Sequence, residues 1–228
     1  MNNSLKFGKF LRRYKRFFVD VEYNTEVIVC HNPNTGSMKN LLIEGVDVVF
    51  SESDNKDRKL KYTLEGFKID GVWIYTNTIN VNNIVYNALL DGTIEQFHNC
   101  DNIKREYKIG DKRIDFYIEY SGKKALVEVK SVSLFDDNFS MFPDAVSKRA
   151  QEHLETLYLS IYHGYEPYIL YIIQSDRKKF RCAEGIDPIY CEIYKRYVPK
   201  YITPLFYRNI FDPYSGNCRL ERLSNVTV

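Results

Sequence analysis

Up to about residue 80, short apolar runs alternate with turn-forming residues, a pattern typical of β-structure. Five runs predict strands, at 17–23, 26–30, 46–50, 62–69 and 72–76. Asp70-Gly71 joins the last two as a two-residue hairpin turn. Five short strands separated by turns favour a small Greek-key barrel, and the oligonucleotide-binding (OB) fold is the commonest such barrel that contacts nucleic acid.

The pattern changes beyond residue 80. Three strands are predicted in succession, at 104–109, 112–120 and 124–130, then a helix at 144–162 and a continuous apolar strand at 168–173. An apolar run of that length is typical of a strand covered on both faces, so the order β-β-β-α-β predicts a mixed sheet with helices against it.

Shorter elements flank this sheet. A helix at 82–90 ends at Asp91-Gly92, and another at 187–197 begins with Asp187 as cap and Pro188 in its first turn, before a strand at 202–207. We therefore expect an α/β (α+β) chain with an OB-like barrel domain over 1–80 and a mixed-sheet domain over 81–228.

The distribution of charged residues along the chain is more informative than the net charge. The net charge of +2 is too small to indicate nucleic acid by itself. Residues 1–16 contain six basic residues and no acid, and a second cluster is relieved only by Asp57: Lys56, Arg58, Lys59 and Lys61. Such clusters can neutralise phosphates, although each alone is also typical of a solvated face or a solubilising terminus.

The five cysteines are odd in number and lack a paired spacing, so we expect neither a disulfide framework nor a zinc site. A reducing compartment suits this usage. The chain has no apolar stretch of membrane-spanning length and no signal-peptide pattern, so we expect a soluble, cytoplasmic protein without a membrane partner.

Candidate chemistry lies on the predicted hairpin at 112–130. Asp115 lies on its first strand, and Glu128 and Lys130 share one face of its second strand because side chains alternate. Ser121-Gly122-Lys123 is suited to the turn, so antiparallel pairing can bring the two carboxylates together. Hard oxygen ligands suit Mg²⁺ or Mn²⁺ better than zinc.

A Glu-x-Lys triplet is weak evidence alone, because the chain holds a second one at Glu106-Tyr107-Lys108. That triplet has no upstream strand ending in an isolated acid, whereas Glu128 has Asp115, an apolar strand and a following helix. The alternative is a solvated cross-strand ion pair.

The order strand-Asp, strand-Glu-x-Lys, helix resembles the PD-(D/E)XK nuclease superfamily, and the whole chain resembles the sugar fermentation stimulation protein family. The resemblance rests on seven blocks: Arg12-Arg13-Tyr14-Lys15-Arg16-Phe17, Asn32-Pro33-Asn34-Thr35-Gly36-Ser37-Met38, Asn77-Thr78, Arg113-Ile114-Asp115-Phe116, Val127-Glu128-Val129-Lys130-Ser131-Val132, Phe142-Pro143-Asp144-Ala145 and Arg149-Ala150-Gln151-Glu152-His153-Leu154. It implies an N-terminal OB-like domain and a nuclease-like C-terminal domain, in bacterial or archaeal proteins described as DNA-binding and linked to regulation of sugar use, maltose especially.

The resemblance also implies residue roles. Asp115 and Glu128 would hold Mg²⁺ or Mn²⁺, and Lys130 would act with them as a catalytic residue, with Ser131 adding a phosphate hydrogen bond. The residues expected to bind nucleic acid, most of all DNA, are Arg12, Arg13, Lys15, Arg16, Asn34, Ser37, Lys39, Gln151 and His153. For Gln151 and His153 a polar helix face is the alternative.

One departure concerns the metal. Relatives often carry Glu-Glu-Ala where this chain has Tyr86-Asn87-Ala88, and Asn87 brings no negative charge, which weakens the expectation of tight metal binding. Two functions follow: a DNA-binding protein linked to sugar regulation with a nuclease-like metal site, or an active Mg²⁺- or Mn²⁺-dependent nuclease. A sugar-sensing or metabolic enzyme has little support, because no phosphate-cradling glycine loop or Ser-His-Asp signature occurs.

Overall fold

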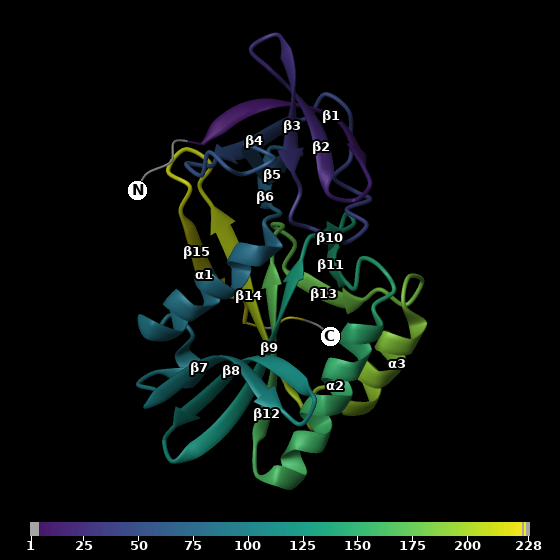
Figure 1. Ribbon diagram of the computed structural model, residues 1–228. Helices are drawn as coiled ribbons and strands as arrows, with labels where there is room; N and C mark the ends of the chain where they lie inside the picture. The colour runs from purple at the N-terminus through teal and green to yellow at the C-terminus, as the bar shows by residue number, and fades with distance from the viewer. Residues whose placement is uncertain (1–4, 225, 227–228) are drawn as a thin grey trace.

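The computed structural model describes residues 5–224 and 226. A β-barrel stands at one end of the molecule, and a mixed sheet with helices on both faces forms the other (Figure 1). The barrel strands are β1 (Lys6–Tyr14), β2 (Phe18–Tyr23), β3 (Glu26–His31), β4 (Asp47–Glu52), β5 (Tyr62–Ile69) and β6 (Val72–Tyr75).

Five strands close the barrel, as the sequence predicts, but they are not the five expected. The order β3-β2-β1-β4-β5 is closed by pairing of β3 with β5, and β6 pairs with β5 alone. The strand that sequence analysis missed is β1, whose exposed and buried positions alternate around Gly8 and Phe10. Of its basic residues, Lys9 and Arg12 are exposed and Lys6 and Arg13 are half-buried, so the high content of basic residues concealed a half-buried strand.

Gly8 explains why β1 can bend across the barrel. A Cβ there would lie 2.5 Å from Val21 Cγ1 and 2.6 Å from the carbonyl oxygen of Glu22. The predicted turn at Asp70-Gly71 is confirmed, with positive φ at both residues.

The second sheet has the order β15-β14-β12-β9-β8-β7, in which β9, β12 and β14 run parallel and the outer pairs run antiparallel. Its strands are β7 (Asn102–Ile109), β8 (Lys112–Tyr120), β9 (Lys123–Val132), β12 (Glu166–Ile173), β14 (Thr203–Phe211) and β15 (Cys218–Arg222). This is the mixed sheet that the sequence predicts.

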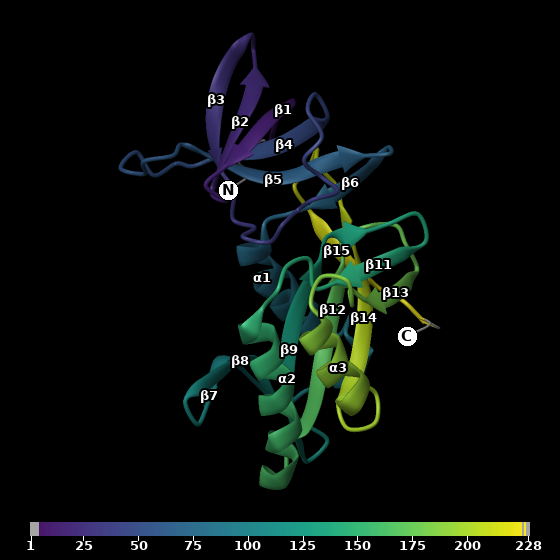
Figure 2. The ribbon, with the colours of Figure 1, turned by 90° about the vertical axis from the view of Figure 1, so that its right-hand side faces the viewer.

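Helices cover both faces of this sheet (Figure 2). α1 (Thr78–Leu90) packs Val81, Val85 and Leu89 on one face, while α2 (Lys148–Ser160) and α3 (Pro188–Tyr197) pack on the other. Short 3₁₀ turns are at Glu95–Phe97 and Ile161–His163, and a small sheet joins β10 (Leu134–Phe135), β11 (Phe139–Phe142) and β13 (Lys179–Cys182). No helix within 5–224 is long and apolar enough to cross a membrane.

Two helix starts differ from the prediction. α1 begins at Thr78, a turn earlier than expected, and α2 begins at Lys148 rather than at residue 144. Ser147 caps α2 by accepting a hydrogen bond from the amide of Ala150, because Asp144 is engaged by the barrel. The predicted cap of α3 is confirmed: Asp187 accepts a hydrogen bond from the amide of Tyr190.

The cysteine expectation is wrong at one pair. Cys182 and Cys191 form a disulfide that joins the end of β13 to α3, with Cα atoms 5.6 Å apart. The connection from β13 folds back onto the first turns of α3, and that tertiary proximity has no counterpart in the spacing of nine residues.

Candidate metal and nucleic-acid site

The strand register brings Asp115 and Glu128 to the same place. β8 and β9 pair as far as Phe116 and Val127, so the next position on each strand sets Asp115 opposite Glu128. The ladder stops there because the Asp115 carboxylate takes over a backbone donor: its Oδ2 accepts the amide N–H of Val129 at 2.7 Å. Its Oδ1 accepts a hydrogen bond from Asn82 Nδ2 of α1 at 2.7 Å.

Hydrogen-bond partners contact only one of the two carboxylate oxygens of Glu128 among the described residues. Its Oε1 accepts a hydrogen bond from Lys130 Nζ at 2.6 Å and contacts Nδ1 of His153 from α2. Its Oε2 is buried and has no hydrogen-bond donor among the residues that the structure describes. Arg149 donates from Nε to Nε2 of His153 at 3.4 Å, which favours the tautomer that donates from Nδ1 to Glu128.

The two carboxylates have different electrostatics. Burial, together with the charge of Glu128, raises the pKa of Asp115 to about 6. Burial also raises the pKa of Glu128, but Lys130 and His153 outweigh it, so this pKa lies below its ordinary value. At neutral pH both groups are therefore ionised, with Asp115 the easier to protonate.

The site opens into a cavity of about 450 Å³ between the barrel and the mixed sheet. Asp115, Glu128 and Lys130 line it from the sheet, Asn82 lines it from α1, and Arg16 lines it from the β1–β2 turn. The segment at 142–147 and Arg149 complete its rim from the α2 side. Both domains therefore supply walls of one cavity.

Arg13 connects the β1–β2 turn with the loop at 32–38, and both of these segments line the cavity. It donates hydrogen bonds to the carbonyl oxygens of Arg16 at 3.0 Å, Asn34 at 3.0 Å, Gly36 at 2.8 Å and Ser37 at 3.1 Å. The barrel turn and the loop at 32–38 are thereby joined through one guanidinium. Arg13, expected to bind nucleic acid, instead has four N–H donors occupied by its own chain.

The loop at 32–38 continues this connection to the second domain. A Cβ on Gly36 would lie 2.1 Å from Oδ2 of Asp144, and that carboxylate accepts the amide N–H of Met38 at 3.3 Å. Thr78, the first residue of α1, donates to the carbonyl oxygen of Pro33 at 3.0 Å. The loop thus contacts the second domain at two places, the start of α1 and the segment before α2.

The other predicted residues divide by exposure. Lys15, Arg16 and Lys39 are exposed, and Arg16 lies at the cavity. Arg12 is exposed but forms an ion pair with Asp20 at 2.7 Å. Asn34 is buried, and its Oδ1 accepts the amide N–H of Gly36 at 2.8 Å.

Four further residues have partners within the protein. Gln151 donates to both carboxylate oxygens of Asp187, at 2.9 and 3.1 Å, and does not line the cavity. His153 faces Glu128 inside the protein. Ser131 lines the cavity while accepting a hydrogen bond from Gln174 at 3.1 Å, and Ser37 is half-buried beside the Arg13 contact.

The α1 residue at the site differs from the one that sequence analysis considered. Asn87 is exposed and lines a separate cavity with β15, whereas Asn82 contacts Asp115. Asn87 therefore has no direct bearing on the two carboxylates. Asn82, Asp144 and Arg149 were missed as site residues, and the only sequence signal was their presence in or beside the blocks at 77–78, 142–145 and 149–154.

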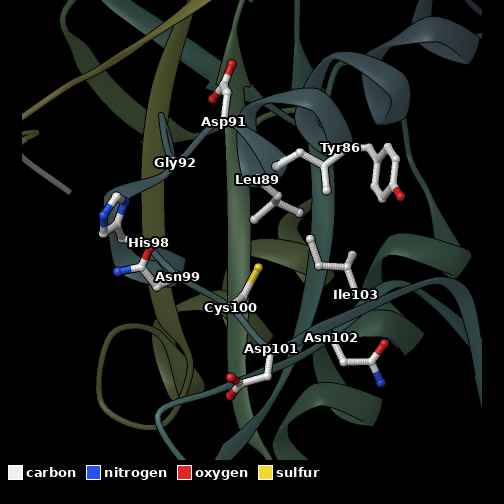
Figure 3. A pocket seen from close by; sticks show the side chains of 11 residues that line it. Tyr86, Leu89, Asp91, Gly92, His98, Asn99, Cys100, Asp101, Asn102 and Ile103 are labelled. Carbon is white, nitrogen blue, oxygen red and sulfur yellow. The ribbon is translucent and has the colours of Figure 1, made fainter.

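A further cavity, of about 540 Å³, lies away from this site (Figure 3). Its labelled side chains come from the end of α1, including Leu89, from the segment before β7, including His98 and Cys100, and from the start of β7, including Ile103. It contains none of the predicted site residues. The buried carboxylates, not cavity size, therefore identify the candidate site.

Comparison with known proteins supports this two-part architecture. Residues 11–76 match the model described as the SfsA N-terminal OB domain, and residues 79–215 match the sugar fermentation stimulation protein RE domain. The described fold is also similar to the structure of Pyrococcus furiosus SfsA in complex with Ca²⁺, with a TM-score of 0.88, 25% identity, and coverage of 98% of this chain and 96% of that one.

Named relatives match over most of their length. The chain is 42% identical over 190 residues to the sugar fermentation stimulation protein homolog of Pelagibacter ubique, covering 82% of each. It is 39% identical over 209 residues to the homolog of Syntrophotalea carbinolica, covering 90% of each. With an OB domain and a restriction-endonuclease-like domain in this order, the chain belongs to the sugar fermentation stimulation protein family.

Proposed function

We propose that this protein binds nucleic acid, with DNA as the first expectation, and holds Mg²⁺ or Mn²⁺ through Asp115 and Glu128. The observation that carries the proposal is the buried, unpaired Oε2 of Glu128 beside a second carboxylate. A buried acceptor without a donor is costly unless another group satisfies it.

A divalent cation suits this pair of carboxylates. Each oxygen of Asp115 uses one lone pair on a protein donor and keeps another, so the carboxylate can also bind a metal. All available donors are oxygens, as Mg²⁺ and Mn²⁺ prefer. The Ca²⁺ named with the Pyrococcus furiosus structure supports a divalent ion in this fold.

Nucleic acid suits the barrel end that faces the cavity. Lys15 and Arg16 lie in the β1–β2 turn, and Arg58, in the β4–β5 segment, is close enough to His31 to help lower its pKa, after burial. His31 pairs with Phe18 directly after the β1–β2 turn. The two basic segments are therefore neighbours, and the corresponding loops of OB domains contact oligonucleotides.

Salt dependence tests nucleic-acid binding. We expect log affinity for a DNA oligonucleotide to fall linearly with log salt, and the slope to decrease by about 1.5 to 2 when Lys15 and Arg16 are both changed to alanine. Lys195→Ala, on the exposed face of α3, is the matched control and should leave the slope unchanged. Binding that does not depend on salt would exclude this mode.

Phosphodiester hydrolysis is the second candidate function, and the position of Lys130 favours it. Its Nζ lies against Glu128 and lines the same cavity as Asp115. When bound, a divalent metal would lower the pKa of a coordinated water and neutralise phosphate charge. Asp115 and Glu128 would position that ion, and Lys130 would donate hydrogen bonds to the water or to a phosphate oxygen.

Cleavage assays test this second function. Single- and double-stranded DNA and RNA are incubated with Mg²⁺ or Mn²⁺ and either the wild type or Glu128→Ala. We expect metal-dependent cleavage by the wild type alone. Equal products from both proteins would assign any cleavage to a contaminant.

The family description adds a biological role to the proposal. We infer that DNA binding by this protein serves regulation of sugar use, maltose use in particular. Comparing maltose-dependent transcript levels between a strain lacking the gene and the parent strain tests this role, and identical transcript levels would contradict it.

A further inference from the structure

We propose that Phe17, at the tip of the β1–β2 turn, stacks an unpaired base next to the metal site, so that the preferred ligand is a nucleic acid with a single-stranded segment. The inference rests on the proposed function and specifies its ligand. Phe17 is 47% exposed and lies between the basic Arg16 and the barrel.

The turn that presents Phe17 is fixed in place. The carbonyl oxygen of Arg16 accepts hydrogen bonds from Arg13 Nε at 3.0 Å and Asn32 Nδ2 at 2.9 Å. The carbonyl oxygen of Phe17 accepts the amide N–H of Asn32 at 2.8 Å. Three hydrogen bonds thus hold the backbone, while the side chains of Lys15, Arg16 and Phe17 project outward.

Two other aromatic rings lie at the base of this turn. Tyr14 and Phe18, which pair across the base of the turn, stack at 5.4 Å with an interplanar angle of 13°. The guanidinium of Arg12 lies 5.4 Å from the ring of Tyr14. An exposed aromatic residue alone is unremarkable, but aromatic rings interleaved with cations are the composition that binds single strands.

The position of the turn connects stacking with the metal site. Arg16 lines the cavity that contains Asp115 and Glu128, and Phe17 is its neighbour in the chain. A base stacked on Phe17 would therefore place an adjoining phosphate near the cavity. In a continuous duplex the faces of the bases are covered by their neighbours, so only an unpaired base can offer Phe17 a free face.

Affinity measurements by fluorescence anisotropy test the inference, with EDTA and again with Ca²⁺. The probes are a labelled single strand, a covalently closed circular duplex that has no ends, and a strand of abasic sugar-phosphate as long as the single strand. We expect Phe17→Ala to weaken single-strand binding about 5- to 150-fold, the range for removing one stacked base, and to change the other two affinities less than twofold.

Two variants control this result. Phe17→Trp should restore single-strand affinity, because it keeps a stacking face. Tyr162→Ala removes an aromatic ring that is 74% exposed in the 3₁₀ turn after α2, and it should leave all three affinities unchanged. The salt slope of Phe17→Ala should equal that of the wild type, since Phe17 neutralises no phosphate.

The outcomes separate the two proposals. Unchanged single-strand affinity in Phe17→Ala, or an equal loss on all three probes, overturns base stacking while salt-dependent binding stands. A wild type that binds none of the probes overturns both. Loss confined to the single strand, with rescue by tryptophan, establishes base stacking at this turn.

Discussion

The chain contains the same three-residue pattern twice, and the two copies have opposite surroundings. Glu106-Tyr107-Lys108 lies on β7 at the edge of the mixed sheet, where both charged side chains are exposed. Glu128-Val129-Lys130 lies on β9 inside the sheet, where Glu128 is 3% and Lys130 is 9% exposed. What distinguishes them is the strand on which each falls.

Burial changes what the same two charges can do. An exposed Glu and Lys are solvated and interact weakly, whereas a buried pair interacts through a medium of lower dielectric constant. Glu106 also has a positive φ and lies between the pairs Arg105–Phe116 and Tyr107–Ile114, so it is opposite Asp115 in register. Proximity along the sheet is therefore not enough; a functional carboxylate needs enclosure and fixed partners.

The largest difference between the two Glu-x-Lys copies should appear in metal binding. We expect Glu128→Ala to weaken Mn²⁺ binding at least about 100-fold, because one of two carboxylate ligands is lost. Glu106→Ala should bind Mn²⁺ as the wild type does. Isothermal titration calorimetry measures both, and a similar loss in the two variants would contradict the distinction between the copies.

The two lysines, Lys130 and Lys108, should contribute very differently to the free energy of unfolding. Lys130→Ala leaves the buried Glu128 without its ammonium partner, so we expect the free energy of unfolding to fall by about 3 kcal/mol at pH 7 without metal. Lys108→Ala should change it by no more than about 0.5 kcal/mol. Urea unfolding followed by circular dichroism measures this, and a loss below about 1 kcal/mol for Lys130→Ala would mean that the pair is more solvated than the structure indicates.

Acid should weaken the metal site through Asp115. Its pKa of about 6 exceeds its ordinary value of 3.8, so below pH 6 a proton must leave before metal binds. Mn²⁺ affinity should therefore fall about tenfold per pH unit between pH 6 and 4.5, and be nearly constant above pH 7. Titrations across this range check the slope; constant affinity down to pH 5 would place the pKa of Asp115 near its ordinary value.

The smallest effect concerns the two asparagines of α1. Asn82→Ala removes the hydrogen bond that orients Asp115 and should weaken Mn²⁺ binding about tenfold. Asn87→Ala, on the exposed side of the same helix, should leave the affinity unchanged. A larger effect of Asn87→Ala would contradict the assignment of Asn82 to the site. It would show instead that position 87, where relatives often carry Glu, contributes to metal binding.

Local pattern explains which parts of the molecule could be predicted. β5 was predicted to the residue because its apolar run ends at a recognisable turn, and Asp115, Glu128 and Lys130 were selected because their surroundings lie within a short stretch of chain. β1 was missed because its charges dominate its composition. Its half-buried alternation matters only once the barrel closes around it.

The remaining site residues depend on contacts between distant segments. Asn82 meets Asp115 across 33 positions, and Asp144 meets Met38 across 106. No periodicity or motif spacing specifies such a contact, because it depends on how distant segments pack, within the second domain for Asn82 and between the two domains for Asp144. The contacts of Arg13 are equally hidden from the sequence, because the loop carbonyl groups that it holds lie 21 to 24 positions away within the barrel domain.

Gly36 contacts one wall of the cavity, the segment at 142–147. Its backbone approaches Asp144 so closely that even a methyl group would collide with the carboxylate. The glycine therefore lets the loop of the barrel domain lie against the Asp144 carboxylate, and any side chain there would displace that carboxylate from the amide of Met38. One added carbon atom on the barrel loop would thus disturb the contact through which the segment at 142–147, a wall of the cavity, meets the barrel.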